Sequence, residues 1–123
     1  MEFSLSVGTF YKVVESNVYF SKIGSKTKEQ HGKIKLDVQK DKLQLTTFAG
    51  NVVLESFLSD KEVNNLNLEI KSIGSAIIDA FQLESLLLSF EKFEKINFNK
   101  KEEDGCEEII VTMISDEEQF QTL

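Results

Sequence analysis

The sequence predicts an α+β domain in which two amphipathic helices pack on one face of an antiparallel sheet. Segments in which apolar and polar residues alternate, as they do in half-buried strands, fill most of the chain. Two other segments place their apolar residues at helical spacing instead. The order strand–helix–three strands occurs twice, which indicates a duplicated β-α-β-β-β unit with a repeat of about sixty residues.

The composition indicates one globular domain over residues 1–123. A chain of this length buries its own core, and ten phenylalanines supply large apolar side chains. No apolar run is long enough to span a membrane, and the start "MEFSLSV" lacks the features of a signal peptide. The one cysteine, Cys106, has no partner for an internal disulfide, so we expect a cytoplasmic protein.

The first half of the chain opens with a strand, because apolar and polar residues alternate in "EFSLSV". A helix is expected next over residues 8–24, with Ser6 or Thr9 as its N-cap and Gly24 at its end. Its apolar stripe consists of Phe10, Val13, Val14 and Val18.

A meander of three strands follows a polar loop over residues 25–31. The clearest alternation in the chain, "GKIKLDVQKDKLQLTTFAG", predicts an antiparallel hairpin that turns at Lys40 and Asp41. A second turn at residues 49–51 leads into the strand "VVLESFL".

The second half repeats this order. "LNLEIKSIGSAIID" predicts one or two strands, with Gly74 as the point of a break, and Asp79 is the expected N-cap of a helix, with Gln82 as its capping-box partner. "KINFNK", "IIVTMI" and "QFQTL" predict strands, and the acidic stretch "KEEDGCEE" is expected to be a loop. The buried stripe of the second helix consists of Leu83, Leu86, Leu87 and Phe90.

No catalytic group stands out. His31, the only histidine, lies in a polar loop, and a hydrolytic triad is recognised only through all of its members. Acidic neighbours on both sides of Cys106 disfavour a reactive thiolate. The acidic runs lack the alternating ligands of a calcium loop, and there is no glycine-rich phosphate loop. The sequence therefore predicts neither an enzyme nor a bound cofactor or metal.

Charge is unevenly distributed along the chain. The net charge is −7, and all fourteen basic residues are lysines. Residues 7–31 hold four lysines against two glutamates, a net of +2, whereas residues 80–95 carry −1 and the remainder −8. Without arginine, bidentate reading of guanine is not expected. An excess of two lysines also arises by chance, so it favours a basic surface on the first helix without establishing one.

Taken in order, these motifs resemble the first of the three domains of the bacterial sliding clamp, the beta subunit of DNA polymerase III. "MEFSLSV" resembles its first strand, and "FYKVVESNVYFSKIGSKT" its first helix and exit loop. "KIKLDVQKDKLQLTTFAGNVVLES", "SAIIDAFQLESLLLSF" and "EEIIVTMISDEEQFQTL" resemble its hairpin, second helix and closing hairpin. The resemblance implies a non-catalytic polymerase accessory subunit, in which helices line a ring around duplex DNA and sheets form the outside.

The resemblance also implies roles for individual residues. Lys26 matches a basic position that approaches DNA phosphate, with Lys22 and Lys12 as further DNA-binding candidates. Phe120 matches an aromatic residue of the subunit interface, and Gln82 is a second interface candidate. At the start of the second helix the clamps often carry basic residues, but this chain has Phe81 and Gln82.

The implied partners are duplex DNA, bound through a ring and without sequence specificity, other clamp domains or subunits, a DNA polymerase and a clamp loader, with no membrane partner. One such domain does not encircle DNA by itself, so the chain is expected to be a fragment, or a short chain that assembles. Two alternatives remain. One is a clamp-like interaction or regulatory module that does not encircle DNA, and the other is an unrelated α+β structural protein.

Overall fold

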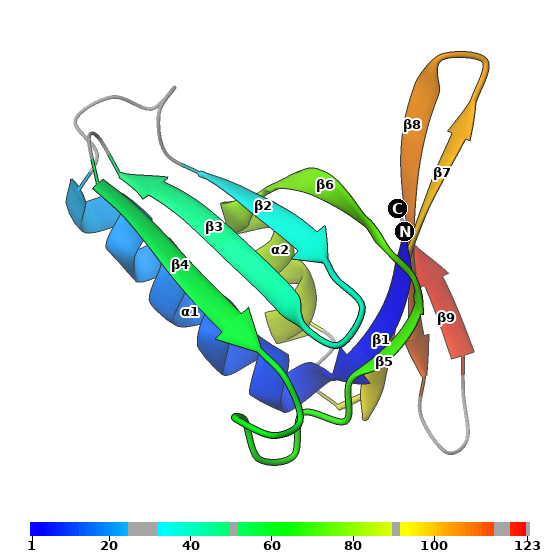
Figure 1. Cartoon of the computed structure of the whole chain (residues 1–123), viewed down its shortest axis with the longest axis horizontal. Helices are drawn as coiled ribbons and strands as arrows, with labels where there is room; N and C mark the ends of the chain where they lie inside the picture. The colour runs from blue at the N-terminus through cyan, green and yellow to red at the C-terminus, as the bar shows by residue number, and fades with distance from the viewer. Residues whose placement is uncertain (25–31, 50–51, 90–91, 115–118, 123) are drawn as a thin grey trace.

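A computed structural model describes most of the chain. The described residues are 1–24, 32–49, 52–89, 92–114 and 119–122, of which 21–24, 49 and 119–122 are described by their backbone alone. The elements in chain order are β1 (Glu2–Ser6), α1 (Val7–Gly24), β2 (Lys33–Val38), β3 (Leu43–Ala49), β4 (Val52–Leu58), β5 (Glu69–Ser72), β6 (Gly74–Asp79), α2 (Ala80–Ser89), β7 (Lys95–Glu103), β8 (Cys106–Ile114) and β9 (Gln119–Thr122) (Figure 1).

The strands form two antiparallel sheets. The four-stranded sheet has the order β4-β3-β2-β6, and the five-stranded sheet has the order β5-β1-β7-β8-β9. The predicted α+β class and the duplicated unit are confirmed, with β5 and β6 together taking the place of the first strand of the second unit. The prediction of a single sheet is refined, because the strands divide between two.

The division between the sheets falls at Ile73, between β5 and β6. β5 pairs with β1 in the five-stranded sheet, and β6 pairs with β2 in the four-stranded sheet. Gly74 has a φ of 148°, and a Cβ added there would lie 3.0 Å from the Cβ of Met1. Glycine is therefore needed where the chain passes from one sheet to the other, which explains the break predicted at this residue.

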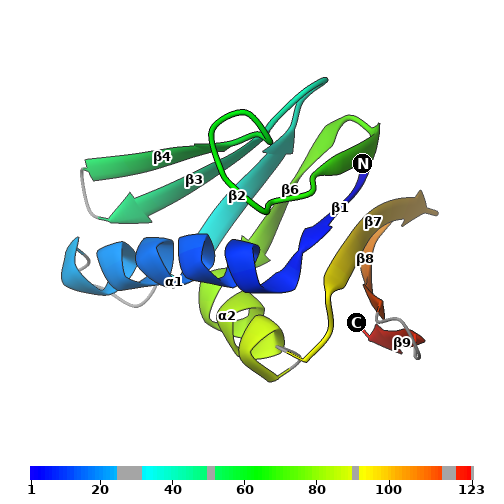
Figure 2. The ribbon, with the colours of Figure 1, turned by 90° about the horizontal axis from the view of Figure 1, so that it is seen from below.

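Both helices lie beneath the four-stranded sheet and against each other (Figure 2). α1 contacts β3 and β4, whereas α2 contacts β2 and β6. Leu36 and Leu45, from the middle of this sheet, are fully buried on the face that the helices cover. Burial of such side chains supplies most of the free energy that holds the helices in place.

Aromatic rings connect the five-stranded sheet to α1. The ring of Phe98 in β7 stacks on Phe3 of β1, with centroids 5.0 Å apart. Phe10 of α1 meets Phe98 edge-on at 5.9 Å. All three side chains are fully buried. One core therefore extends from the helices to both sheets.

One buried polar cluster joins α1 to the four-stranded sheet. The Asn17 amide nitrogen donates to the Val13 carbonyl at 2.8 Å and to the Ser56 hydroxyl at 3.3 Å. The Thr47 hydroxyl donates to the Asn17 amide oxygen at 2.8 Å. Because Asn17 and Thr47 are both buried, these hydrogen bonds offset the cost of removing the polar groups from water.

The predicted start of α2 is confirmed. The Gln82 backbone N–H donates to the Asp79 carboxylate at 2.8 Å, so Asp79 is the N-cap. The described hydrogen bonds include this half of the predicted capping box only. Gly32 precedes β2 with a φ of 89°, and its carbonyl accepts a hydrogen bond from the Ala80 N–H, which ties β2 to the same helix start.

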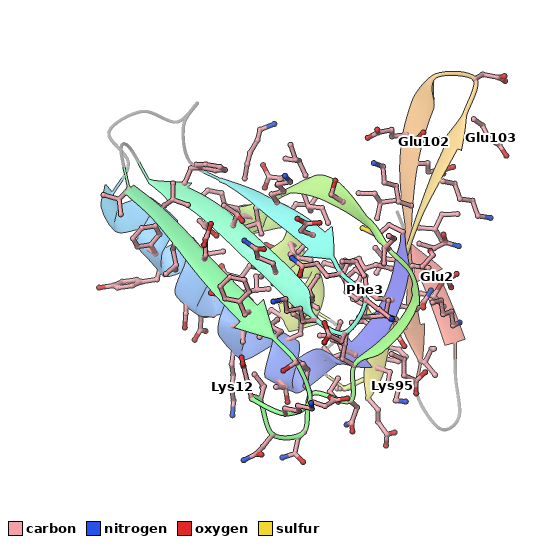
Figure 3. All side chains as sticks on the ribbon, in the orientation of Figure 1. Glu2, Phe3, Lys12, Lys95, Glu102 and Glu103 are labelled. Carbon is pink, nitrogen blue, oxygen red and sulfur yellow. The ribbon has the colours of Figure 1, made fainter. Side chains whose placement is uncertain are left out.

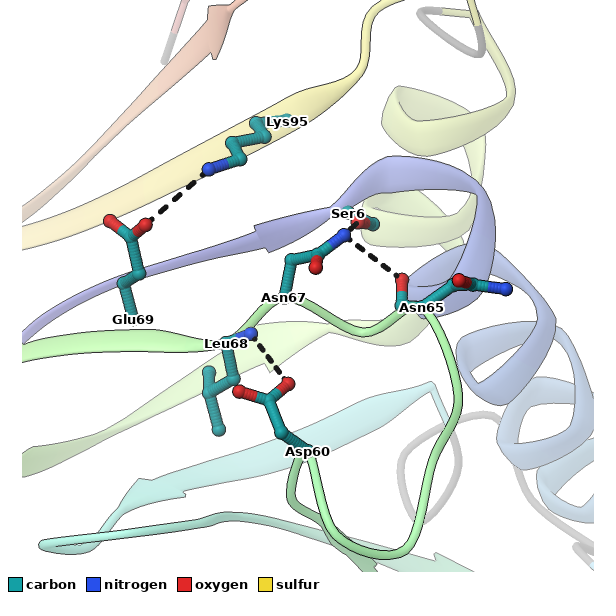
Figure 4. Close-up of polar contacts among 7 residues, drawn as sticks. All are labelled: Ser6, Asp60, Asn65, Asn67, Leu68, Glu69 and Lys95. Carbon is teal, nitrogen blue, oxygen red and sulfur yellow. Dashed lines mark hydrogen bonds and ion pairs between the residues drawn. The ribbon is translucent and has the colours of Figure 1, made fainter.

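The start of α1 differs from the prediction. The Ser6 hydroxyl accepts a hydrogen bond from the Asn67 amide at 2.8 Å, and the Thr9 hydroxyl donates to the Asn65 carbonyl at 3.0 Å. Both proposed capping hydroxyls therefore bind the loop between β4 and β5, as Figure 4 shows for Ser6. In the same loop the Leu68 N–H donates to the Asp60 carboxylate at 3.0 Å.

The acidic stretch "KEEDGCEE" is the tip of a hairpin, but its expected extent as a loop is wrong, because most of it belongs to the two strands. β7 continues to Glu103 and β8 begins at Cys106, so only Asp104 and Gly105 make the turn. Both turn residues have positive φ, 52° and 80°, as a type I′ turn requires. Glu102 and Glu103 lie near the tip, where charged side chains stay in water (Figure 3).

The predicted helix stripes are largely confirmed. In α1 Phe10, Val14 and Val18 are buried, and Val13 is half-buried. In α2 Leu83 and Leu87 are buried, whereas Leu86 is half-buried and lines a cavity. Phe90 lies outside the described residues.

Candidate interaction surfaces

The helix surface turned away from the sheets is the expected DNA-binding surface. Lys12 is exposed on α1 and its side chain points away from the sheets (Figure 3). Lys22 lies in the last turns of α1, where only the backbone is described, and Lys26 lies outside the described residues. The DNA-binding role expected for these lysines stays a prediction.

The two helices carry no excess of positive charge. Lys12 and Lys22 are balanced by Glu15 of α1 and Glu84 of α2. Glu15 also accepts a hydrogen bond from the Tyr11 hydroxyl at 2.9 Å. Of the net +2 counted over residues 7–31, +1 comes from α1 and +1 from residues 25–31, which are outside the described part of the chain.

The two predicted interface residues lie on different elements, β9 and α2. β9, the outer strand of the five-stranded sheet, places Phe120 opposite Met113, but only its backbone is described. Gln82 is exposed in the first turn of α2. The structure leaves their interface role as a prediction.

Gln82 lines a largely apolar cavity of about 230 Å³ between α2, β6 and β8. Leu86 of α2, Ile109 of β8 and Ile77 of β6 line it, and Ile77 is 64% exposed. The Lys100 ammonium of β7 lies 3.3 Å from the Glu107 carboxylate of β8 and donates to the Ser75 carbonyl of β6 at 2.9 Å. The hydrogen bond to Ser75 ties the β7–β8 hairpin to β6.

A second apolar surface lies on the four-stranded sheet, on the face opposite the helices. Phe48 of β3 and Val53 of β4 are directly paired, and both are nearly half exposed. Phe57 is 43% exposed four residue pairs along on the same face, where the Lys42 ammonium lies 5.2 Å from its ring centroid. We call Phe48, Val53 and Phe57 the β4 edge patch, because β4 is the outer strand of the sheet.

The sequence holds a signal for this patch that the element prediction did not use. "VVLESFL" begins with three neighbouring apolar residues and ends with two, and Phe48 interrupts the alternation of β3. Since successive residues of a strand point to opposite faces, such pairs place apolar groups on both faces. A strand with only one face packed on the core instead keeps its other face polar.

The residues first considered for chemistry form no site. Cys106 is exposed near the tip of the β7–β8 hairpin, and His31 lies outside the described residues. Among the described residues no group of three histidine, cysteine or acidic side chains is placed to hold a metal ion. No described helix is long and apolar enough to cross a membrane.

Two antiparallel sheets with two neighbouring helices, built from a doubled strand–helix–strand unit, define the class of sliding-clamp domains. The beta chain of DNA polymerase III from Streptococcus pneumoniae superposes with a TM-score of 0.70 at 20% identity. The DNA polymerase sliding clamp from Bacillus subtilis gives 0.70 at 17% identity, and the proliferating cellular nuclear antigen from Entamoeba histolytica gives 0.67 at 16%. At these identities the likeness establishes the fold.

The chain belongs to the family DUF7339, described as a domain of unknown function, whose sequence profile matches residues 7–103. No curated protein matches the chain. Each structural match covers 98% of this chain, which spans 30% of the two bacterial clamps and 42% of the Entamoeba protein. The chain thus has the extent of one clamp domain.

Proposed function

We propose that this protein is a non-catalytic clamp-fold interaction module that binds a protein partner and does not encircle DNA by itself. The observation that carries this proposal is the balance of charge on the helices, where Lys12 and Lys22 are equalled in number by Glu15 and Glu84. Sequence-independent DNA binding depends on lysine and arginine neutralising phosphates. A helix surface with no net charge offers little of that attraction, and the whole chain, at −7, repels DNA.

The apolar surfaces support a protein as the partner. Phe48, Val53 and Phe57 are exposed together on one face, next to an unpaired strand edge. Exposed apolar patches of this kind mark binding sites for proteins far more often than for DNA. An open strand edge adds backbone donors and acceptors that another strand satisfies.

The test is binding of the full chain to a short fluorescent DNA duplex over a salt series, together with sedimentation over a range of protein concentration. We expect a monomer with no measurable DNA binding at physiological salt. Salt-dependent binding that Lys12→Glu abolishes would refute the proposal. Lys101→Glu, an exposed lysine of the β7–β8 hairpin, is the matched control for a general loss of positive charge.

The second candidate is a processivity clamp assembled from several copies. The fold likeness over 98% of the chain favours it, as do the outer strands β4 and β9, which lie at edges where another domain can pair. In this candidate Lys26, Lys22 and Lys12 contact DNA, Phe120 and Gln82 lie at interfaces, and polymerase and clamp loader are the partners.

Assembly distinguishes the two candidates. A ring requires self-association in sedimentation and retention on closed circular DNA that is lost when the circle is cut. In such a ring Lys26→Glu is expected to weaken loading onto primed DNA. Unchanged loading and processivity would remove Lys26 from the DNA-binding residues.

A further inference from the structure

The edge strand β4 presents one face with a distinctive pattern. Val53, Glu55 and Phe57 point to the side of the four-stranded sheet that the helices leave uncovered, because they alternate with residues turned inward. Glu55 lies directly opposite Thr46, and it is exposed. The outer strand thus displays an acid between two apolar side chains.

Among the described residues, no cation forms an ion pair with Glu55. Glu55 is also the only charged residue of β4. Lys35 lies on the same face but one strand further away, beyond Thr46. Lys42, the nearest lysine along β3, lies over the Phe57 ring instead. A strand added at this edge would bring its own side chain directly opposite Glu55.

A second copy of the chain is a poor match for this edge. Two β4 strands paired about a two-fold axis through Glu55 place the two carboxylates opposite each other, which is unfavourable. If the register is shifted by two residues, Glu55 of each copy lies opposite Val53 or Phe57 of the other copy, and neither of these side chains carries a positive charge. The edge strands β6 and β9 carry no lysine, and Lys71, the lysine of β5, is 3.5 Å from Glu2 in an ion pair.

We propose that β4 binds an extended segment of another protein that has a lysine or arginine flanked, two residues away on each side, by apolar side chains. Such a segment pairs antiparallel with Val52–Leu58, places its basic residue opposite Glu55, and packs its apolar residues beside Val53 and Phe57. The backbone hydrogen bonds and apolar contacts supply affinity, and Glu55 supplies selectivity. This inference rests on the proposed function and names its site and the chemistry of its partner.

The experiment is selection of binders from a displayed library of random dodecapeptides against the full chain and against Glu55→Lys. The native chain is expected to enrich apolar–x–basic–x–apolar sequences, and Glu55→Lys the same pattern with an acidic centre. For a synthetic peptide from the native selection, Glu55→Gln is expected to weaken binding by about 2- to 5-fold, the usual range for one cross-strand pair.

An exposed apolar residue on the same face but in another strand supplies the matched control. Val53→Ser is expected to weaken binding of the same peptide more than Glu55→Gln does, whereas Ile77→Ser, on the same face but in the opposite outer strand, is expected to leave it unchanged. Unfolding curves of each variant verify that the fold is retained.

The inference is overturned if no peptide is enriched, or if the native chain and Glu55→Lys enrich peptides with the same central charge. It is also overturned if Ile77→Ser weakens binding of the peptide as much as Val53→Ser does. None of these outcomes depends on whether the chain binds DNA or self-associates. Salt-dependent DNA binding or ring assembly would overturn the proposed function instead, so the two failures are separable.

Discussion

The two sheets share one core but turn different surfaces to the outside. On the five-stranded sheet several outward charged side chains are paired: Lys95 lies 3.4 Å from Glu69, and Glu2 meets Lys71 at 3.5 Å and the Asn97 amide at 3.3 Å. Figure 4 shows the Lys95–Glu69 pair beside β1. The outward face of the four-stranded sheet instead exposes the β4 edge patch.

This difference locates the binding function. A face whose charges are already paired has less to gain from a charged partner, because each ion pair must first be broken. A face with exposed phenylalanine and valine gains free energy when a partner removes them from water. The comparison therefore favours the four-stranded sheet as the docking side.

The largest expected effect is on stability and concerns the inner faces of the two sheets. Truncation of a buried side chain should destabilise the fold by a similar amount in either sheet. Phe98→Ala in the five-stranded sheet is expected to lower the free energy of unfolding by about 3–5 kcal/mol, and Leu45→Ala in the four-stranded sheet by about 2–5 kcal/mol, since both side chains are fully buried. Denaturant titration measures both. Phe57→Ala on the outer face is the control and should change stability by less than about 0.5 kcal/mol.

An intermediate effect is expected at the polar cluster under the four-stranded sheet. Thr47→Val removes the donor to the buried Asn17 oxygen and should cost about 1–3 kcal/mol. Thermal unfolding measures the loss. Thr46→Val, the neighbouring residue with its side chain on the opposite face, is the matched control. Equal losses for the two variants would show that the hydrogen bond contributes nothing.

The smallest effect is expected on the outer face of the five-stranded sheet. Lys95→Ala breaks an ion pair whose side chains are 38% and 62% exposed, so the change in unfolding free energy should be below about 1 kcal/mol. Peptide binding by the β4 edge should not change. Loss of that binding in Lys95→Ala would contradict the assignment of docking to the other sheet.

Local patterns predicted most of the elements. The alternation through β2 and β3, the N-cap at Asp79 and the break at Gly74 depend on residues near each other in the chain, so the sequence alone contains them. The β7–β8 hairpin was mispredicted because seven charged or turn-forming residues resemble a loop, although Asp104-Gly105 is a strong two-residue turn signal.

The candidate site was less accessible to prediction. Lys12, Lys22 and Lys26 follow from the resemblance to clamp domains, but the charge of a surface also depends on which acids the fold brings beside them. The β4 edge patch was not chosen at all. An apolar residue in a strand is equally compatible with the core and with an exposed face until the neighbouring layer is known.

The sequence by itself determined both helices and most of the strands, because periodicity, capping and turn residues act within a few positions. Only the tertiary structure decided which strands share a sheet. β1 pairs with β5 and with β7, more than sixty residues away in the chain, and the change of sheet at Ile73 follows from those long-range pairings. The same pairings leave β4 at an edge, with Glu55 between two exposed apolar side chains.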